Sequence, residues 1–139
     1  MAPTPTEVQA KADKKGAAPA STWSGTFEVQ NNFNQQLTNV TVMHRCKDTG
    51  ADTVTRDILN NNTSIGATNF ETASGDTDYW YVSFLDENSD LWTAHLSLDY
   101  HESESNSGTV VEISINPQIF IVTIGKSSKN TTYDQNDSL

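Results

Sequence analysis

The amino-acid sequence predicts an all-β protein built as a single antiparallel β-sandwich of about eight strands. First, apolar and polar residues alternate with a period of two in segments rich in Val, Ile, Thr, Tyr, Phe and Trp, which is the pattern of half-buried strands. Second, clusters of Asn, Asp, Ser and Gly separate these segments at intervals of about 8–12 residues, as in sandwiches and barrels. Third, no segment shows the i, i+3, i+4, i+7 spacing of an amphipathic helix.

The first half of the chain contains four expected strands between Asn- and Asp-rich turns. In the first strand, Phe27 and Val29 fall on one face. In the second, Val42, His44 and Cys46 share a face with further apolar residues, so this face is expected to point inward. The third and fourth strands have weaker patterns. The expected ranges are 23–30, 37–47, 52–59 and 64–72.

The second half contains four more expected strands. Trp80, Val82 and Phe84 lie on one face of the first of them. The last is apolar on both faces, so we expect it to be a central or covered strand. The expected ranges are 78–85, 91–98, 109–115 and 119–124.

A hairpin formed by 78–85 and 91–98 is the clearest local feature, because a five-residue turn joins two regular alternations. Trp80 and Trp92 fall on its inward faces. Each tryptophan can bury roughly 150–250 Å² of surface, so the two are expected to anchor the core.

Length and charge exclude several classes of protein. The chain has 139 residues, enough for one domain, and a formal net charge of -10. Such a charge repels phosphate backbones, so we expect no nucleic-acid partner. No apolar run approaches the ~20 residues of a membrane-spanning helix. A single cysteine, Cys46, excludes an internal disulfide framework and a Cys-rich zinc module.

The ends of the chain differ in composition from its middle. Residues 1–22 are rich in Ala, Pro, Thr and Lys and are expected to form a flexible N-terminal arm. Residues 23–125 form the predicted sandwich domain, and 126–139 a frayed polar C-terminal tail. The first residues lack the apolar stretch of a secretory signal, and a lone thiol suits a reducing compartment, so a cytoplasmic location is predicted.

Motifs for metal binding and catalysis are weak. His44 and Cys46 could supply two metal ligands, but a zinc site needs three or four. The loop at 86–90 starts like a calcium-binding EF-hand loop, yet Leu91 and Ser97 replace the glycine and glutamate that such a loop requires. No nucleophile elbow, zinc-protease motif or phosphate-binding glycine loop is present. We therefore predict a protein that is not an enzyme and holds no metal or other cofactor.

One face of the hairpin is a candidate binding site. If Trp80 points inward, Tyr79 and Tyr81 project from the outer face. Acidic residues flank the same strand. Aromatic rings beside carboxylates suit cationic head groups, and they equally suit sugar rings. The alternative is that a sheet edge, a loop or a partner subunit covers both tyrosines. The candidate ligand-binding residues are Tyr79, Tyr81, Asp76, Asp78, Asp86 and Glu87.

The sequence resembles the PUD-type domains, small β-sandwich proteins of nematodes and fungi with a fold similar to that of aegerolysins. The resemblance spans about residues 25–125 and rests on four features: an early Asn run, a His-bearing second strand, the D-Y-W-x-V-x-F strand at 78–84, and Trp92 at the start of its partner. It implies an aegerolysin-like, cytosolic sandwich that dimerises in some members. No lipid-site motif matches, so no lipid-binding residue is carried over.

These observations predict a soluble, non-catalytic binding protein that recognises a zwitterionic lipid head group or a glycan. Contact with a membrane would be peripheral. The strong negative charge would be repelled by an anionic leaflet, so any lipid should be zwitterionic. The alternative is a structural protein that assembles through its sheet edges and N-terminal arm, and a homo-oligomer is expected in either case.

Overall fold

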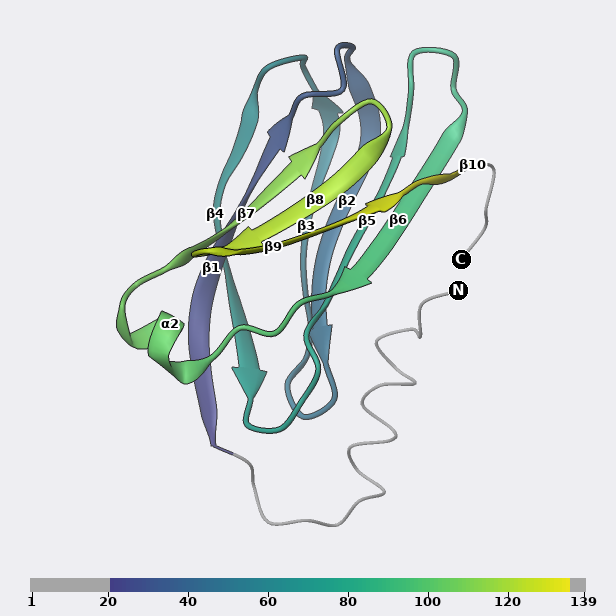
Figure 1. Ribbon diagram of the computed structural model, residues 1–139. Helices are drawn as coiled ribbons and strands as arrows, with labels where there is room; N and C mark the ends of the chain where they lie inside the picture. Colours follow the sequence, from purple (N-terminus) through teal and green to yellow (C-terminus); the bar gives the residue numbers. More distant parts are fainter. Residues whose placement is uncertain (1–20, 136–139) are drawn as a thin grey trace.

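A computed structural model describes residues 21–135 and confirms the all-β sandwich (Figure 1). The predicted N-terminal arm therefore lies outside the described residues, apart from its last two positions. Within 21–135 the chain forms ten strands and one short helix. The strands are β1 (Thr22–Asn31), β2 (Leu37–Cys46), β3 (Gly50–Leu59), β4 (Ser64–Ala73), β5 (Tyr79–Leu85), β6 (Leu91–Ser97), β7 (Val110–Ile115), β8 (Ile119–Ile124), β9 (Ser127–Thr132) and β10 (Asp134–Gln135).

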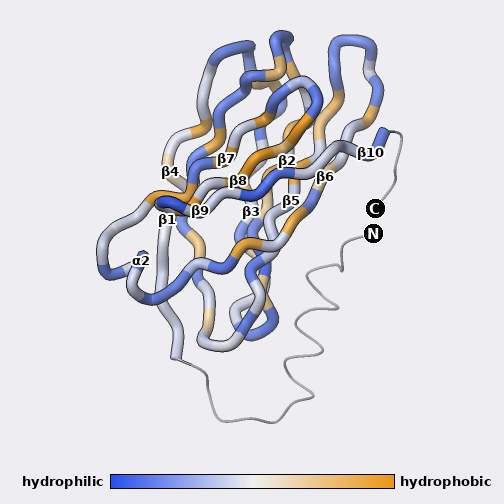
Figure 2. The backbone as a smooth tube through the Cα atoms, viewed as in Figure 1, coloured by the Kyte–Doolittle hydropathy of each residue, from blue (hydrophilic) through white to orange (hydrophobic). Residues whose placement is uncertain are grey.

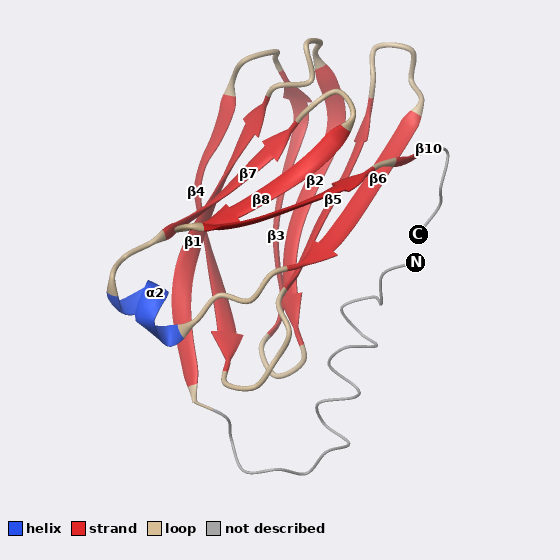
Figure 3. Cartoon of the chain, viewed as in Figure 1, coloured by secondary structure: helices blue, strands red, loops and turns tan. Residues whose placement is uncertain are grey.

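Two five-stranded sheets pack face to face (Figure 3). Sheet A has the order β4-β1-β7-β8-β9, and sheet B has the order β10-β6-β5-β2-β3. All neighbours are antiparallel except β1 and β7, which run parallel. The eight predicted strands are all present, with bounds within two residues of those expected. The sequence gives no indication of the parallel pair, which is formed by strands far apart in the chain.

The core lies between the sheets and consists of the side chains predicted to point inward. Phe27, Val29, Val42, Val82 and Phe84 are each at most 1% exposed. Strand β8 lies between β7 and β9, as expected for a segment that is apolar on both faces. Figure 2 shows hydrophilic residues in most of the connections and hydrophobic residues in the strands, most clearly in β8.

The two predicted core anchors differ in depth. Trp80 is fully buried and meets Phe27 and Phe70 edge-on, with ring centroids 5.8 and 5.1 Å away. Trp92 is only partly buried and packs against the rim of the core with Tyr133, whose ring centroid is 5.6 Å away.

The prediction of a frayed end at 126–139 is wrong for residues 127–135, because two strands form there. Residues 127–132 form β9, which pairs with β8, and 134–135 form β10, which pairs with β6. Tyr133 lies between them; its hydroxyl donates to the carbonyl oxygen of Ile119 at 3.0 Å and accepts from the backbone N–H of Asn116 at 3.1 Å. Because β9 is an exposed edge, backbone pairing forms it without any apolar alternation.

The Ser-rich loop at 101–108 contains helix α2 (Glu102–Asn106), which the sequence pattern does not predict. Its first turn is closed by Glu104, whose carboxylate accepts from the backbone N–H of His101 at 2.7 Å. With five residues it is the only helix within the described range, and no helix there is long and apolar enough to cross a membrane.

Candidate functional site

The two tyrosines of the candidate binding face differ in exposure. Tyr79 and Tyr81 do lie on the face of β5 opposite Trp80. However, Tyr81 is only 3% exposed, while Tyr79 is half-buried. Arg45 lies beside Tyr81, with its guanidinium carbon 5.9 Å from the ring centroid. Both tyrosines thus lie on the outer face, and of the two alternatives left open by the sequence, the covered one applies to Tyr81.

The four acidic candidates do not converge on one site. Asp76 and Asp78 precede β5, whereas Asp86 and Glu87 follow it. The seven residues of the strand separate the two pairs, which corresponds to roughly 23 Å. Asp78 and Asp86 are 1% and 7% exposed, so neither carboxylate is available to a ligand in this structure.

Asp78 is instead the centre of a buried hydrogen-bond network. Its carboxylate accepts from the backbone N–H of Tyr100 at 2.8 Å and from the hydroxyl of Thr72. It also meets Nε2 of His44 at 2.7 Å, and Nδ1 of the same ring lies 3.3 Å from the carboxylate of Asp52. The network joins β2, β3, β4 and the start of β5, so its evident role is structural.

His44 has a raised pKa although it is fully buried. Burial alone lowers the pKa, because it disfavours the charged ring. Hydrogen bonds and charge attraction from Asp52 and Asp78 outweigh this effect. The aromatic rings of Phe70 and Trp80 also pack against the imidazole, with ring centroids 4.6 and 4.8 Å away.

This raised pKa predicts a pH dependence of stability. Protonated His44 stabilises the fold fully below its unfolded value of 6.5, and the contribution is lost as the pH rises through the folded pKa. We therefore expect the stability advantage of the wild type over His44→Gln to be full below about pH 6.5 and to shrink as the pH rises above it. Urea unfolding of both proteins at each pH measures it. An advantage that stays constant, or grows with pH, would contradict this assignment.

Asp86 holds the β5–β6 turn together. Its carboxylate accepts from the backbone N–H groups of Asn88 and Asp90 at 2.8 and 3.0 Å, and from the indole of Trp92 at 2.9 Å. Burial raises the pKa of this carboxyl, but the three donors more than compensate, so the pKa is lowered overall. The candidate calcium loop is thus a turn whose carboxylate is already engaged by the protein.

Cys46 is also structural in its surroundings. It is buried beside Thr49, with sulfur and hydroxyl 2.8 Å apart. Burial raises the pKa of the thiol, which makes it a poor nucleophile and metal ligand at neutral pH. Among residues 21–135 no group of three or more His, Cys, Asp or Glu side chains could hold a metal ion.

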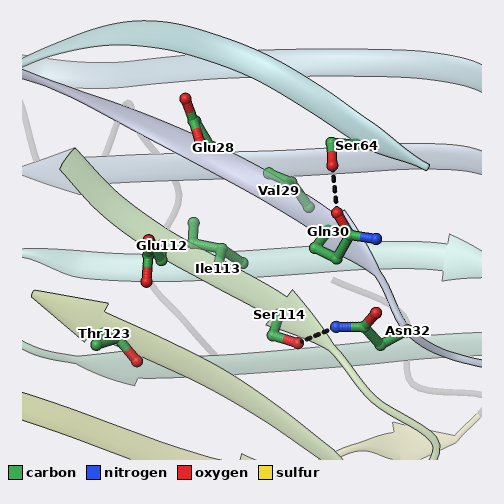
Figure 4. A pocket seen from close by; sticks show the side chains of 9 residues that line it. All are labelled: Glu28, Val29, Gln30, Asn32, Ser64, Glu112, Ile113, Ser114 and Thr123. Atoms are coloured by element: carbon green, nitrogen blue, oxygen red, sulfur yellow. Dashed lines mark hydrogen bonds between the residues drawn. The ribbon is translucent and has the colours of Figure 1, made fainter. Parts of the chain in front are cut away.

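A shallow groove crosses the outer face of sheet A, over β1, β7 and β8 (Figure 4). Its volume is about 280 Å³, close to the lower end of small-molecule pockets. Val29 and Ile113 contribute to its floor, and the start of β4 adds Ser64. Its other lining residues are polar: Glu28, Gln30, Asn32, Glu112, Ser114 and Thr123.

Two glutamates on neighbouring strands line this groove. Glu28 and Glu112 occupy the same register position on the parallel strands β1 and β7. Both are exposed, and neither lies within 4.0 Å of a basic group among the described residues. Their like charges repel each other, which costs roughly 0.2–1 kcal/mol on a sheet.

Hydrogen bonds fix the polar groups at one end of the groove. The amide of Asn32 donates to the hydroxyl of Ser114 at 2.8 Å, and the hydroxyl of Ser64 bonds the amide oxygen of Gln30 (Figure 4). The groove therefore offers preset hydroxyl and amide groups next to two free carboxylates.

No family model and no curated protein matches the chain. The resemblance to PUD-type domains and aegerolysins therefore stays a prediction.

The sequence predicts which residues of β1 and β7 face outward, but it does not predict that these two strands are neighbours. Period-2 alternation places Glu28 and Gln30 on the outer face of β1, and Glu112 and Ser114 on the outer face of β7. What the pattern lacks is the parallel pairing of these strands, which lie more than 80 residues apart in the chain. Without that pairing, two separate polar faces do not suggest one site.

Proposed function

We propose that this protein is a non-catalytic binding protein for a glycan and that the groove on sheet A is its binding site. The observation that carries the proposal is the lining of the groove, which combines two free carboxylates with fixed amide and hydroxyl groups. Carboxylates accept hydrogen bonds from hydroxyls, and amides both donate and accept them. These are the groups that a polyhydroxylated ligand needs along a polar surface.

The charge of the groove limits the ligand. Among the described residues the lining contains two glutamates and no Lys or Arg. A phosphorylated, sulfated or carboxylated ligand would face repulsion from both carboxylates. A neutral sugar avoids that repulsion and gains charge-assisted hydrogen bonds, which are stronger than neutral ones.

A lipid head group has weaker support. That hypothesis depends on the Tyr79/Tyr81 face, where Tyr81 is only 3% exposed. Two of the flanking carboxylates, those of Asp78 and Asp86, are buried and hydrogen-bonded within the protein. Self-assembly through sheet edges, the other hypothesis, remains a prediction.

We expect Glu28→Gln and Glu112→Gln each to weaken glycan binding about tenfold, the equivalent of roughly 1.4 kcal/mol, which is a modest value for losing a hydrogen bond to a charged group. The measurement is binding of the fluorescently labelled full chain to an array of neutral and charged glycans, followed by titration of the strongest hits. Removing one of two adjacent like charges should leave the fold as stable as before or slightly more stable.

Glu102→Gln is the matched control, because Glu102 is an exposed glutamate on α2, outside the groove. It makes the same change in net charge and should bind as the wild type does. Equal weakening in all three variants would assign the effect to bulk charge, and an array without neutral-glycan hits would reject the proposal.

A further inference from the structure

A second hollow lies on sheet A, where helix α2 packs against β1 (Figure 1). Its volume is about 240 Å³, and it is lined by the start of β1, by the edge strand β4, by α2 and by the segment that leads from α2 to β7. We call it the α2 hollow. Apart from two glycines, its lining residues are Ser24, Thr26, Asn69, Tyr100, Ser105 and Thr109.

The α2 hollow and the groove are neighbours on the outer face of sheet A. Thr26 lines the hollow and Glu28 lines the groove, and the fully buried Phe27 lies between them on β1. Thr26 and Glu28 therefore point to the same, outer face, and so does Asn69, the register partner of Thr26 on β4. Alternate residues of a strand are only roughly 7 Å apart, so the two hollows form one track along β1.

This track is long enough for several sugar units. The outer residues of β1 from Ser24 to Gln30 span roughly 20 Å, which is several times the width of a single sugar ring. Each hollow alone is smaller than the roughly 300–1,000 Å³ of typical small-molecule pockets, whereas the two together fall within that range.

The α2 hollow offers uncharged polar groups on fixed walls. No charged side chain is among its described lining residues. The hydroxyl of Ser105 donates to the backbone oxygen of Ser24 at 2.6 Å, which holds α2 against β1. The hydroxyl of Tyr100 donates to the carbonyl oxygen of Thr109 at 2.7 Å. The amide of Asn69 is exposed, so it can donate to and accept from a ligand.

We propose that the ligand is a neutral oligosaccharide that lies along β1 and occupies both hollows at once. The carboxylates of Glu28 and Glu112 hold some of its sugar units in the groove. Thr26 and Asn69 hold further units in the α2 hollow through neutral hydrogen bonds. This proposal rests on the proposed glycan-binding function and specifies the class of ligand, because a single sugar would fill only one of the two hollows.

Ligands of increasing length test the proposal. Single sugars, disaccharides and hexasaccharides, built from the sugar of the strongest neutral hit on the array, are titrated into the full chain by isothermal calorimetry. We expect the hexasaccharide to bind at least about tenfold more tightly than the disaccharide, because it adds two or more hydrogen bonds in the α2 hollow.

Two variants of the α2 hollow locate the added contacts. Asn69→Ala removes an exposed amide, and Thr26→Val removes a hydroxyl at nearly constant volume. Each should weaken hexasaccharide binding about fivefold, the equivalent of roughly 1 kcal/mol, a typical value for one hydrogen bond. Neither should change binding of the disaccharide, which the groove holds. Asn106→Ala is the matched control, because Asn106 is an exposed residue of α2 outside the hollow, and it should leave both affinities unchanged.

The outcomes separate this proposal from the proposed function. Equal affinities for the disaccharide and the hexasaccharide would overturn the oligosaccharide proposal and leave the groove as a site for short glycans. A gain with length that neither Asn69→Ala nor Thr26→Val reduces would also overturn it, because the longer chain would then leave the groove in another direction. Failure of glycans of every length to bind would reject the proposed function, and this proposal with it.

Discussion

Replacing Asp78 with alanine should lower the free energy of unfolding by about 3–5 kcal/mol, the range for breaking a buried ion pair. Asp78 is 1% exposed and receives hydrogen bonds from three separate parts of the chain, through His44, Thr72 and Tyr100. Alanine would leave the buried imidazole without its closer carboxylate and a backbone N–H without an acceptor. The loss therefore combines a buried charge left with only the more distant carboxylate of Asp52 and donors left unsatisfied.

Urea unfolding followed by tryptophan fluorescence measures this loss. Asp78→Asn keeps the volume and one acceptor oxygen, so it should lose less than Asp78→Ala. Asp57→Asn is the control, because Asp57 is an exposed residue of the edge strand β3 and should change stability by no more than about 0.5 kcal/mol. A loss below about 1 kcal/mol for Asp78→Ala would show that the network is not needed for stability.

Trp80→Ala should destabilise the protein by a similar amount, about 3–5 kcal/mol. The side chain is fully buried and contacts rings from sheet A (Phe27 and Phe70) as well as His44 of its own sheet. Its indole donates to the carbonyl oxygen of Leu98 at 2.9 Å. The substitution removes contacts between the two sheets and leaves a large cavity in a tightly packed interior.

Trp92→Ala is the matched comparison, because it removes the same side chain from the rim of the core. Trp92 is half-buried, so we expect a clearly smaller loss than for Trp80. Chemical denaturation measures the free energy of unfolding of both variants. The two values are compared when the slopes of the unfolding transitions are equal. Equal losses would contradict the placement of Trp80 at the centre and Trp92 at the rim.

Local patterns predict the eight strands from β1 to β8 well because these strands have at least one face with side chains against the core. The alternation around Trp80, Val82 and Phe84 is imposed by burial, and it appears in the sequence because polar residues there would lose their water. Strand β9 has no such constraint. Its residues are polar on both faces, so its sequence is indistinguishable from a frayed end, and it is held by backbone hydrogen bonds to β8.

The residues of the candidate site are harder to predict because their surroundings depend on long-range neighbours. Asp78 looked like a surface carboxylate beside a tyrosine, but the strand order of sheet B brings His44 of β2 against it. Alternation places Glu28 and Glu112 on the outer faces of two strands far apart in the chain, and only the β1–β7 pairing brings them together. Alternation identifies the face of the strand on which a side chain lies. Which residue of another strand lies beside it follows only from the order of the strands in the sheet.

The central claim, that the sheet A groove binds a glycan, is tested most directly by nuclear magnetic resonance. Labelled full-length protein is titrated with the strongest neutral glycan from the array, and backbone amide shifts are followed at every assigned residue. We predict saturable shifts confined to the groove, at Glu28, Gln30, Glu112 and Ser114, with Tyr79 unaffected. Shifts centred on Tyr79, or none at saturating glycan, would contradict the assignment of this groove as the binding site.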